Sequence, residues 1–270
     1  MFAFLKRLFT FGRNELYEQG IAFFNKHQYN EAISRFEAVL ERKSSTSSLY
    51  RNLAQVYCGY AHRNLGVMLF ATGNFSAALQ EFERAISFNR SHSQLYHFIG
   101  ICQNNLADFE GAVKTFKKIL EMDPRSIPTK LKLGIALHNL QMWDRSVEIY
   151  ASILEQQPLY ADVHYRLGLA LLGQSKPAEA VTAFQKALSI NPRYTDARLK
   201  LGVTQAYLGH FDEAMENFNE ILVHYPEFAD VYYFKGIVYS GRNAIDAAIE
   251  AFTQALTINA SYKDARIKSP

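Results

Sequence analysis

Apolar residues recur along this chain at intervals of three and four, the period of an amphipathic helix. Two neighbouring stretches show it well, ADVHYRLGLALLG (161–173) and PAEAVTAFQKALSI (177–190), with apolar residues at i, i+3, i+4 and i+7. Comparable pairs of stretches follow one another through most of the sequence. The pattern predicts an all-α protein built from successive helix pairs.

The helix pairs repeat with a fixed period. A glycine recurs at a constant spacing of thirty-four positions, at Gly66, Gly100, Gly134, Gly168, Gly202 and Gly236. Gly20 precedes this series by forty-six positions, so the first interval is longer by twelve. Twelve positions after each glycine comes a small residue: Ala32, Ala78, Ala112, Ser146, Ala180, Ala214 or Ala248. Four positions later comes an aromatic one: Phe36, Phe82, Phe116, Tyr150, Phe184, Phe218 or Phe252.

These spacings have a physical interpretation. The glycine and the small residue predict a close crossing of two helices, and the aromatic residue predicts a filled gap toward the next pair. Asp123–Pro124 and Asn191–Pro192 predict the end of a second helix, because proline disfavours helical geometry in the residue before it. A single pair cannot bury its apolar face, so stacked neighbours are expected to share one continuous core.

The pattern resembles the tetratricopeptide repeat (TPR) family. Seven repeats are in phase, beginning at about Arg13, Gly59, Ser93, Ile127, Ala161, Thr195 and Ala229. The resemblance implies a right-handed superhelical solenoid of antiparallel helix pairs over residues 13–262. It also implies a concave groove, lined by the first helix of each repeat, that binds a protein or peptide.

The insertion that lengthens the first interval lies near 47–58, ahead of the second repeat. No helix breaker occurs between Ser48 and Ala71, and Ser47 or Ser48 is a suitable N-cap. We therefore predict a second repeat with an N-terminally extended first helix of about 25 residues, roughly 37 Å long. It is expected to project about three turns beyond the stack. It would serve either as a packing buttress for the first repeat or as a docking surface.

The two ends of the chain differ from the repeats. Residues 1–12 are apolar and basic, and the residues expected to mediate self-association or membrane contact are Phe2, Phe4, Leu5, Lys6, Arg7, Leu8 and Phe9. This segment is expected to dock on its own solenoid, to join copies into a homo-oligomer, or to lie on a membrane surface as a peripheral anchor. Residues 263–270 are expected to start a capping helix or tail.

The TPR resemblance also implies which residues line the groove. They occupy the second, fifth, sixth, ninth, twelfth and thirteenth positions of the repeats: Phe24, Asn64, Val67, Phe70, Phe98, Ile101, Asn104, Asn105, Lys132, Ile135, His138, Asn139, Arg166, Leu169 and Lys200. This set predicts an apolar N-terminal part and a more basic middle. The basic residues have a second interpretation, since Asp162–Arg166 and Asp196–Lys200 are i,i+4 pairs typical of a solvated helix face.

Composition and motifs exclude several other functions. The chain carries 29 basic and 26 acidic residues, and residues 1–14 account for the whole excess, so no nucleic-acid partner is expected. Two cysteines, Cys58 and Cys102, form no disulfide framework and suggest a reducing compartment. No phosphate-binding or hydrolase motif occurs, so no catalytic residue and no cofactor are expected.

No metal site is expected either. His62, His92 and His97 are near one another in sequence, but no cysteine or carboxylate is identified at ligand spacing beside them. We interpret them as surface histidines.

The sequence thus indicates a non-enzymatic adaptor that binds a peptide or partner protein in its groove. It is expected to be cytoplasmic, or membrane-associated through residues 1–12. Two alternatives stay open: a self-assembling scaffold organised through the N-terminal segment, as in magnetosome-type TPR scaffolds, and the regulatory TPR arm of a larger enzyme.

Overall fold

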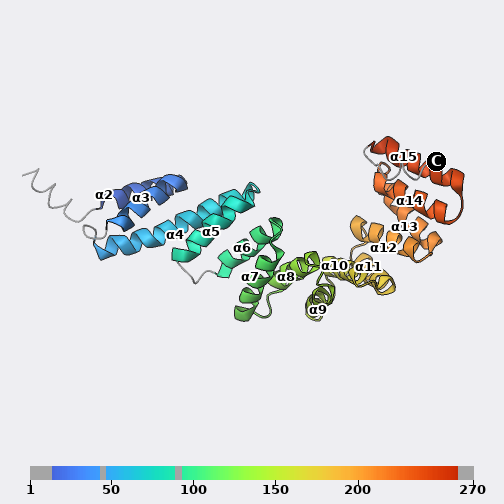
Figure 1. The fold of residues 1–270 in the computed structure, drawn as a ribbon, viewed down its shortest axis with the longest axis horizontal. Helices are drawn as coiled ribbons and strands as arrows, with labels where there is room; N and C mark the ends of the chain where they lie inside the picture. The colour runs from blue at the N-terminus through green and yellow to red at the C-terminus, as the bar shows by residue number, and fades with distance from the viewer. Residues whose placement is uncertain (1–13, 43–46, 89–92, 261–270) are drawn as a thin grey trace, which may run out of the picture. The chain divides into compact units, whose positions relative to one another are not determined.

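A computed structural model describes residues 14–42, 47–88 and 93–260, and all the regular structure within these ranges is helical. The helices alternate as the first and second members of successive pairs (Figure 1). The first helices are α2 (Glu15–Asn25), α4 (Ser48–Ala71), α6 (Ser93–Asn105), α8 (Ile127–Asn139), α10 (Ala161–Gly173), α12 (Thr195–Tyr207) and α14 (Ala229–Gly241). The second helices are α3 (Tyr29–Glu41), α5 (Phe75–Phe88), α7 (Phe109–Met122), α9 (Trp143–Leu154), α11 (Pro177–Ile190), α13 (Phe211–His224) and α15 (Ile245–Ile258). The predicted all-α repeat architecture is confirmed.

The sequence period also gives correct helix boundaries. The first helices α6, α8, α10, α12 and α14 begin at the residues that the repeat frame predicts. Helices α7 and α11 end with Asp123 and Asn191 as their C-caps, each directly before a proline. Proline in the following position disfavours the helical conformation for these residues, as expected.

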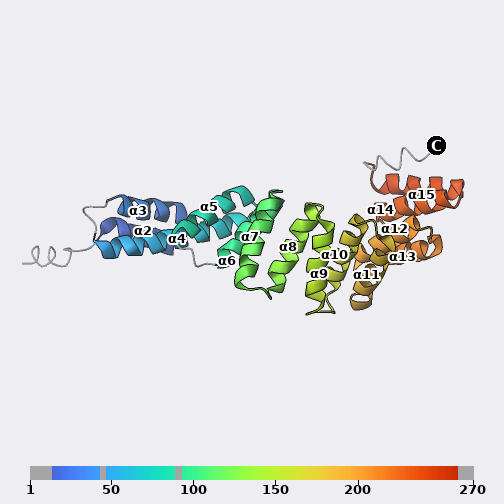
Figure 2. The ribbon, with the colours of Figure 1, turned by 60° about the horizontal axis from the view of Figure 1, so that its bottom comes forward.

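The chain forms two compact units, residues 1–132 and residues 133–270. We call them the N-terminal unit and the C-terminal unit and describe each separately. In the C-terminal unit, helices α10 to α13 each pack against the next one along the chain (Figure 2). This serial packing is the arrangement in which each repeat buries the apolar face of its neighbour.

The core of each repeat is a glycine covered by an aromatic ring. In the fifth repeat a Cβ added to Gly168 would lie 2.5 Å from Cε1 of Phe184, so only glycine lets the ring approach α10 this closely. The same glycine–aromatic contact occurs in all seven repeats, and each ring is almost completely buried. In the fourth repeat Ser146 replaces the usual alanine and donates a buried hydrogen bond of 3.0 Å to the Gly134 carbonyl oxygen.

The turn between the two helices of a repeat is also periodic. Each turn has one residue with φ between 58° and 81°: His27, Gly73, Ala107, Gln141, Ser175, Gly209 or Asn243. This left-handed conformation favours glycine. Only two of the seven positions are glycine, so this feature leaves little signal in the sequence.

Helix α4 is confirmed as one long helix of 24 residues, with Ser47 as its N-cap. The Ser47 side chain accepts a hydrogen bond from the Tyr50 backbone N–H. The expectation that its N-terminal part projects beyond the stack is wrong. Ala54 and Cys58 in this part are fully buried, because α2 and α3 pack along it (Figure 1). The extension is therefore a buttress for the first repeat.

The first repeat packs on α4 in a shifted register. In the second repeat the core aromatic stacks on the residue at the sixth position of the next repeat, as Phe82 does on Phe98. The equivalent residue for Phe36 would be Asn64, but Phe36 stacks on Tyr57, seven residues earlier. Seven residues are two helical turns, or about 10 Å. The inserted residues lengthen α4, and the first repeat packs on the added turns.

The predictions for residues 1–12 and 263–270 lie outside the described residues. None of the helices within the described ranges is long and apolar enough to cross a lipid bilayer.

Candidate peptide-binding face

One position on the first helix of every repeat holds an aliphatic side chain that the core leaves partly exposed. This is the ninth position of the repeat, directly after the core glycine. It is Ile21, Val67 or Ile101 in the N-terminal unit and Ile135, Leu169, Val203 or Ile237 in the C-terminal unit. None of the seven is fully buried, although the glycine before each one is. Each of these aliphatic side chains therefore keeps part of its surface in contact with solvent.

Not every residue expected in the groove is available to a ligand. In the N-terminal unit Phe98 stacks on Phe82 and meets Phe70 edge-on, so its ring is used in packing between repeats. Phe24 packs edge-on against Tyr29 and Tyr57. Both rings are partly buried against the core. Phe70 likewise packs edge-on against Phe75 and Phe98 and is partly buried. The other groove residues expected in this unit all keep some exposed surface: Asn64, Val67, Ile101, Asn104, Asn105 and Lys132.

Two neighbouring asparagines end helix α6. Asn105 is exposed and donates a hydrogen bond of 2.9 Å to the Ile101 carbonyl oxygen of its own helix. Asn104 is half-buried, and its Oδ1 atom is enclosed without a hydrogen-bond partner. An enclosed acceptor without a donor is costly. A rotation of this side chain toward a ligand N–H would satisfy the acceptor.

Helix α4 carries an exposed apolar stripe. Leu49, Val56, Tyr60 and Val67 are all exposed, and their spacings of seven, four and seven place them on one line along the helix. Tyr60 and Val67 occupy the second and ninth positions of the repeat, so the stripe continues the groove-lining positions onto the added turns. Beside it lies a pocket of about 220 Å³, lined by Val56, Gly59, Tyr60 and Arg63 of α4 together with Phe88 and Leu95. The insertion therefore enlarges the apolar surface of the N-terminal unit.

The C-terminal unit presents a more polar face. Ile135, His138, Arg166, Leu169 and Lys200 are half-buried on α8, α10 and α12, and Asn139 is exposed. The expected pair of Asp162 and Arg166 is confirmed, with the Arg166 Nε donating to the carboxylate over 2.8 Å. The other Asp162 oxygen accepts a hydrogen bond of 3.0 Å from the Tyr194 hydroxyl. The Arg166 side chain is therefore fixed by Asp162, and the Asp162 carboxylate partly neutralises its charge.

The second expected pair is not formed. No ion pair joins Asp196 and Lys200 in the described part of the chain, although Asp196 is exposed and Lys200 is half-buried on the same helix. Lys132 likewise forms no ion pair with a described carboxylate. Its charge acts instead on His97, whose pKa is lowered by burial and, less strongly, by Lys132. Lys132 in the N-terminal unit and Lys200 in the C-terminal unit are thus charges at groove positions that form no ion pair with a described carboxylate.

The pKa of His138 should be visible in the fluorescence of Trp143, the single tryptophan of the chain. The two rings meet edge-on, 4.7 Å apart. Burial lowers the pKa of His138, and the positive charge of Arg166 lowers it further. We therefore expect a fluorescence transition with a midpoint below about 6.5, the usual histidine value.

His138→Gln should abolish this transition, and Arg166→Gln should raise its midpoint. Because the folded chain favours the neutral ring, the contribution of His138 to stability is present above the unfolded pKa and is lost as the pH falls. A midpoint at or above the usual value would contradict this assignment.

The interpretation of the histidines needs a correction at His62. It is buried, not on the surface, and its Nδ1 atom lies 2.6 Å from Oε2 of Glu81. The sequence signal was present, because Cys58 precedes His62 by four residues, which places both on one face of a helix. The repeat period alone does not predict that Cys58 and His62 meet Glu37 and Glu81, which come from two other helices, α3 and α5.

Comparison with known proteins agrees with this fold. Sequence models of the tetratricopeptide repeat match residues 17–95 and 199–263, residues 93–126, residues 129–159 and residues 161–194. The first of these models covers more than half of the chain by itself. No curated protein sequence matches the chain.

Solved structures of similar fold include several TPR proteins. YrrB, described as a TPR protein with an unusual peptide-binding site, is 24% identical over 69% of this chain and 96% of its own, with a TM-score of 0.57. MamA is 30% identical over 62% of this chain and 97% of its own, with a TM-score of 0.56. PilF of Pseudomonas aeruginosa is 17% identical over 77% and 95%, with a TM-score of 0.63. The repeat period, the helix pairs and the sequence matches agree, and the chain belongs to the tetratricopeptide repeat family.

Proposed function

We propose that this protein is a non-enzymatic adaptor that binds a peptide or partner protein on the face formed by the first helices of its repeats. Membership of the TPR family supports a protein–protein interaction role. The observation that carries the proposal is the aliphatic ninth position, which stays partly exposed in all seven repeats. A core position would be buried and a purely solvated position would be polar, so a contact surface accounts best for this row.

In the N-terminal unit the ligand would be largely apolar. The stripe on α4 and its adjoining pocket suit an amphipathic helix or an extended peptide with one bulky apolar side chain. Asn104 and Asn105 lie on the next first helix and would hydrogen-bond the ligand backbone. The apolar contacts would supply most of the affinity, and the asparagines would orient the chain.

Lys132 and Lys200 would each favour an acidic residue in a ligand bound to its own unit. Neither has a described carboxylate partner, so each could pair with a ligand acid without breaking an existing ion pair. Arg166 would contribute less, since Asp162 already neutralises part of its charge.

The proposal is tested with peptides selected against the whole protein from a random displayed library. We expect Val67→Glu to weaken binding of the selected peptides at least 10-fold, because it places a charge in the apolar stripe. Asn105→Ala should weaken binding less, since one hydrogen bond contributes about 0.5–1.5 kcal/mol. Binding is measured by calorimetric titration.

Val223→Glu is the matched control. Val223 lies on a second helix, α13, and is 76% exposed, whereas Val67 is 38% exposed. Both variants receive the same charge at a surface valine, so a general loss of solubility or charge balance affects both. If Val223→Glu weakens binding as much as Val67→Glu does, the first helices are not the binding face.

The two alternative functions depend on residues 1–12 and 263–270, which lie outside the described residues. The self-assembling scaffold and the regulatory arm of an enzyme therefore stay predictions from the sequence.

A further inference from the structure

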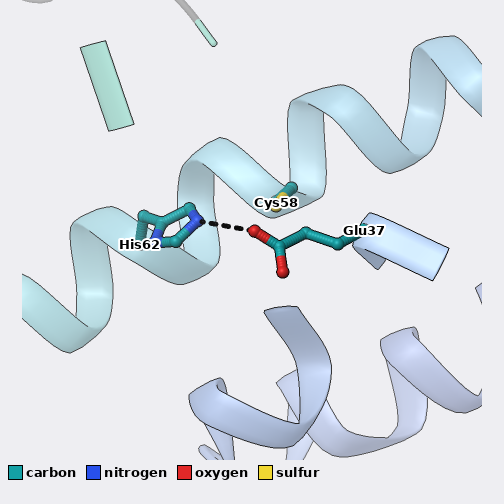
Figure 3. Close-up of side chains that lie close together, drawn as sticks. All are labelled: Glu37, Cys58 and His62. Carbon is teal, nitrogen blue, oxygen red and sulfur yellow. Dashed lines mark ion pairs between the residues drawn. The ribbon is translucent and has the colours of Figure 1, made fainter. Parts of the chain in front are cut away.

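A histidine, a cysteine and a glutamate meet where the first repeat packs on α4. His62 is 1% exposed and Cys58 is fully buried, and both lie on the same face of α4. Glu37 reaches them from α3 (Figure 3). One ligand atom from each residue, the His62 ring nitrogen, Cys58 Sγ and a Glu37 carboxylate oxygen, lies within 4.8 Å of the other two.

One nitrogen of the His62 ring has a hydrogen-bond partner and the other has none. The Nδ1 atom is 2.6 Å from Oε2 of Glu81, a largely buried carboxylate on α5. The ring also stacks on Phe88, with centroids 5.7 Å apart. Nε2 is enclosed and has no hydrogen-bond partner, and Oε1 of Glu37 is 4.0 Å away from it. A buried polar nitrogen without a partner is costly unless something binds it.

We propose that Glu37, Cys58 and His62 form a binding site for a divalent metal ion of the zinc type. Sulfur, imidazole nitrogen and carboxylate oxygen are the donors that zinc prefers, and three protein ligands leave a fourth position for water or another ligand. Glu81 would be a positioning residue. A carboxylate on the far nitrogen of a metal-bound imidazole fixes its orientation and raises its basicity.

The geometry needs only a small adjustment to receive an ion. Zinc–ligand bonds of about 2.0–2.3 Å place tetrahedral donors roughly 3.5 Å apart. The distances between the three donor atoms of Glu37, Cys58 and His62 would therefore shorten by about 1 Å. Glu37 is 49% exposed and free to make most of this movement.

Binding would release the thiol proton to solvent, because a thiolate is the ligand. Burial raises the pKa of Cys58 to about 12, with a further contribution from the charges of Glu37 and Glu81. Bound thiolate and Glu37 carboxylate together would balance the two charges of the ion.

The shifted register of the first repeat creates this site. Packing on the added turns of α4 brings Glu37 opposite Cys58 and His62. A metal ion there would link α3 to α4, so its binding would stabilise the packing of the first repeat on α4. The expectation of no metal site relied on the absence of a cysteine or carboxylate near the histidines, and that premise is wrong for His62.

The test is titration of the full chain, first freed of metal with a chelator, with cobalt(II) as the probe. We expect a thiolate-to-cobalt charge-transfer band in the near ultraviolet, strong visible bands of tetrahedral cobalt, and saturation at one ion per chain. Zinc should displace the cobalt and remove the bands. Cys58→Ser should abolish the charge-transfer band, and Glu81→Gln should weaken binding about 10–100-fold.

Cys102→Ser is the matched control, because Cys102 is the other buried cysteine and belongs to no described metal-ligand cluster. It should leave the bands unchanged. Glu37→Gln alters a surface position, so the fold should survive, and it should weaken cobalt binding at least 10-fold even if Cys58→Ser does not fold. Absence of a charge-transfer band in the unaltered chain at millimolar cobalt would overturn the proposal. So would a band lost in Cys102→Ser, or cobalt affinity unchanged in Glu37→Gln.

Discussion

Replacing Phe184 with alanine is expected to destabilise the C-terminal unit by about 3–5 kcal/mol, the usual cost of removing a buried phenylalanine ring. The ring is fully buried. It covers Gly168 and lies 5.9 Å from the ring of Tyr165. Because Gly168 has no side chain, it cannot help to fill the cavity, so the loss should fall at the high end for its chemistry.

Urea-induced unfolding, followed by the circular dichroism of the helices, measures this loss as a lower midpoint. Tyr207→Ala is the control, since Tyr207 is 81% exposed on the neighbouring first helix, α12. A surface substitution of this kind usually changes stability by less than about 0.5 kcal/mol. Equal losses in the two variants would show that the aromatic of the repeat is not the centre of the core.

The helix pairs were predictable because the contact that defines them is local. The core aromatic follows the core glycine at a constant spacing, and the turn between them is short enough to fix which residues meet. The contact between Gly168 and Phe184 therefore fixes how α10 packs on α11, independently of the neighbouring repeats. This is why the repeats predicted to begin at about Ser93, Ile127 and the later positions coincide with first helices of the structure.

The packing of the first repeat was not predictable from the period. A frame set by the repeat period assigns Asn64 as the partner of Phe36, but the structure assigns Tyr57. The longer helix α4 has room for the first repeat in more than one register, and the pattern of one sequence does not say which of them the first repeat uses. The spacing of four between Cys58 and His62 is visible in the sequence, but their meeting with Glu37 depends on that register and could not be found from motif spacing.

The candidate binding face was partly predictable. The aliphatic ninth position follows from the frame, and its partial exposure agrees with a groove-lining role. Phe24 and Phe98 also satisfy the frame but pack between helices. A long aromatic side chain at a groove position reaches a neighbouring repeat more readily than the shorter valine or isoleucine does. The position in the repeat alone does not separate the two outcomes.

Replacing Tyr57 with alanine is expected to release the first repeat without unfolding the others. Its ring contacts Tyr17, Phe24 and Phe36 with centroids 5.6–6.1 Å apart, and these three residues come from α2 and α3. Losing a half-buried aromatic at such a joint should cost about 2–3 kcal/mol, somewhat less than for a fully buried ring. In a linear array each repeat contacts only its neighbours, so the loss should stay at the end of the chain.

Hydrogen exchange of the backbone amides distinguishes local from global loss. We expect protection in α2 and α3 to fall by roughly 30–160-fold, the factor that corresponds to about 2–3 kcal/mol, while protection in α10 to α13 stays unchanged. Leu49→Ala is the control, since Leu49 is on the same helix but exposed. Equal loss of protection in α3 and α11 would mean that the chain unfolds as one cooperative unit. Loss confined to α2 and α3 would show that the added turns of α4 exist to hold a first repeat that the period alone cannot place.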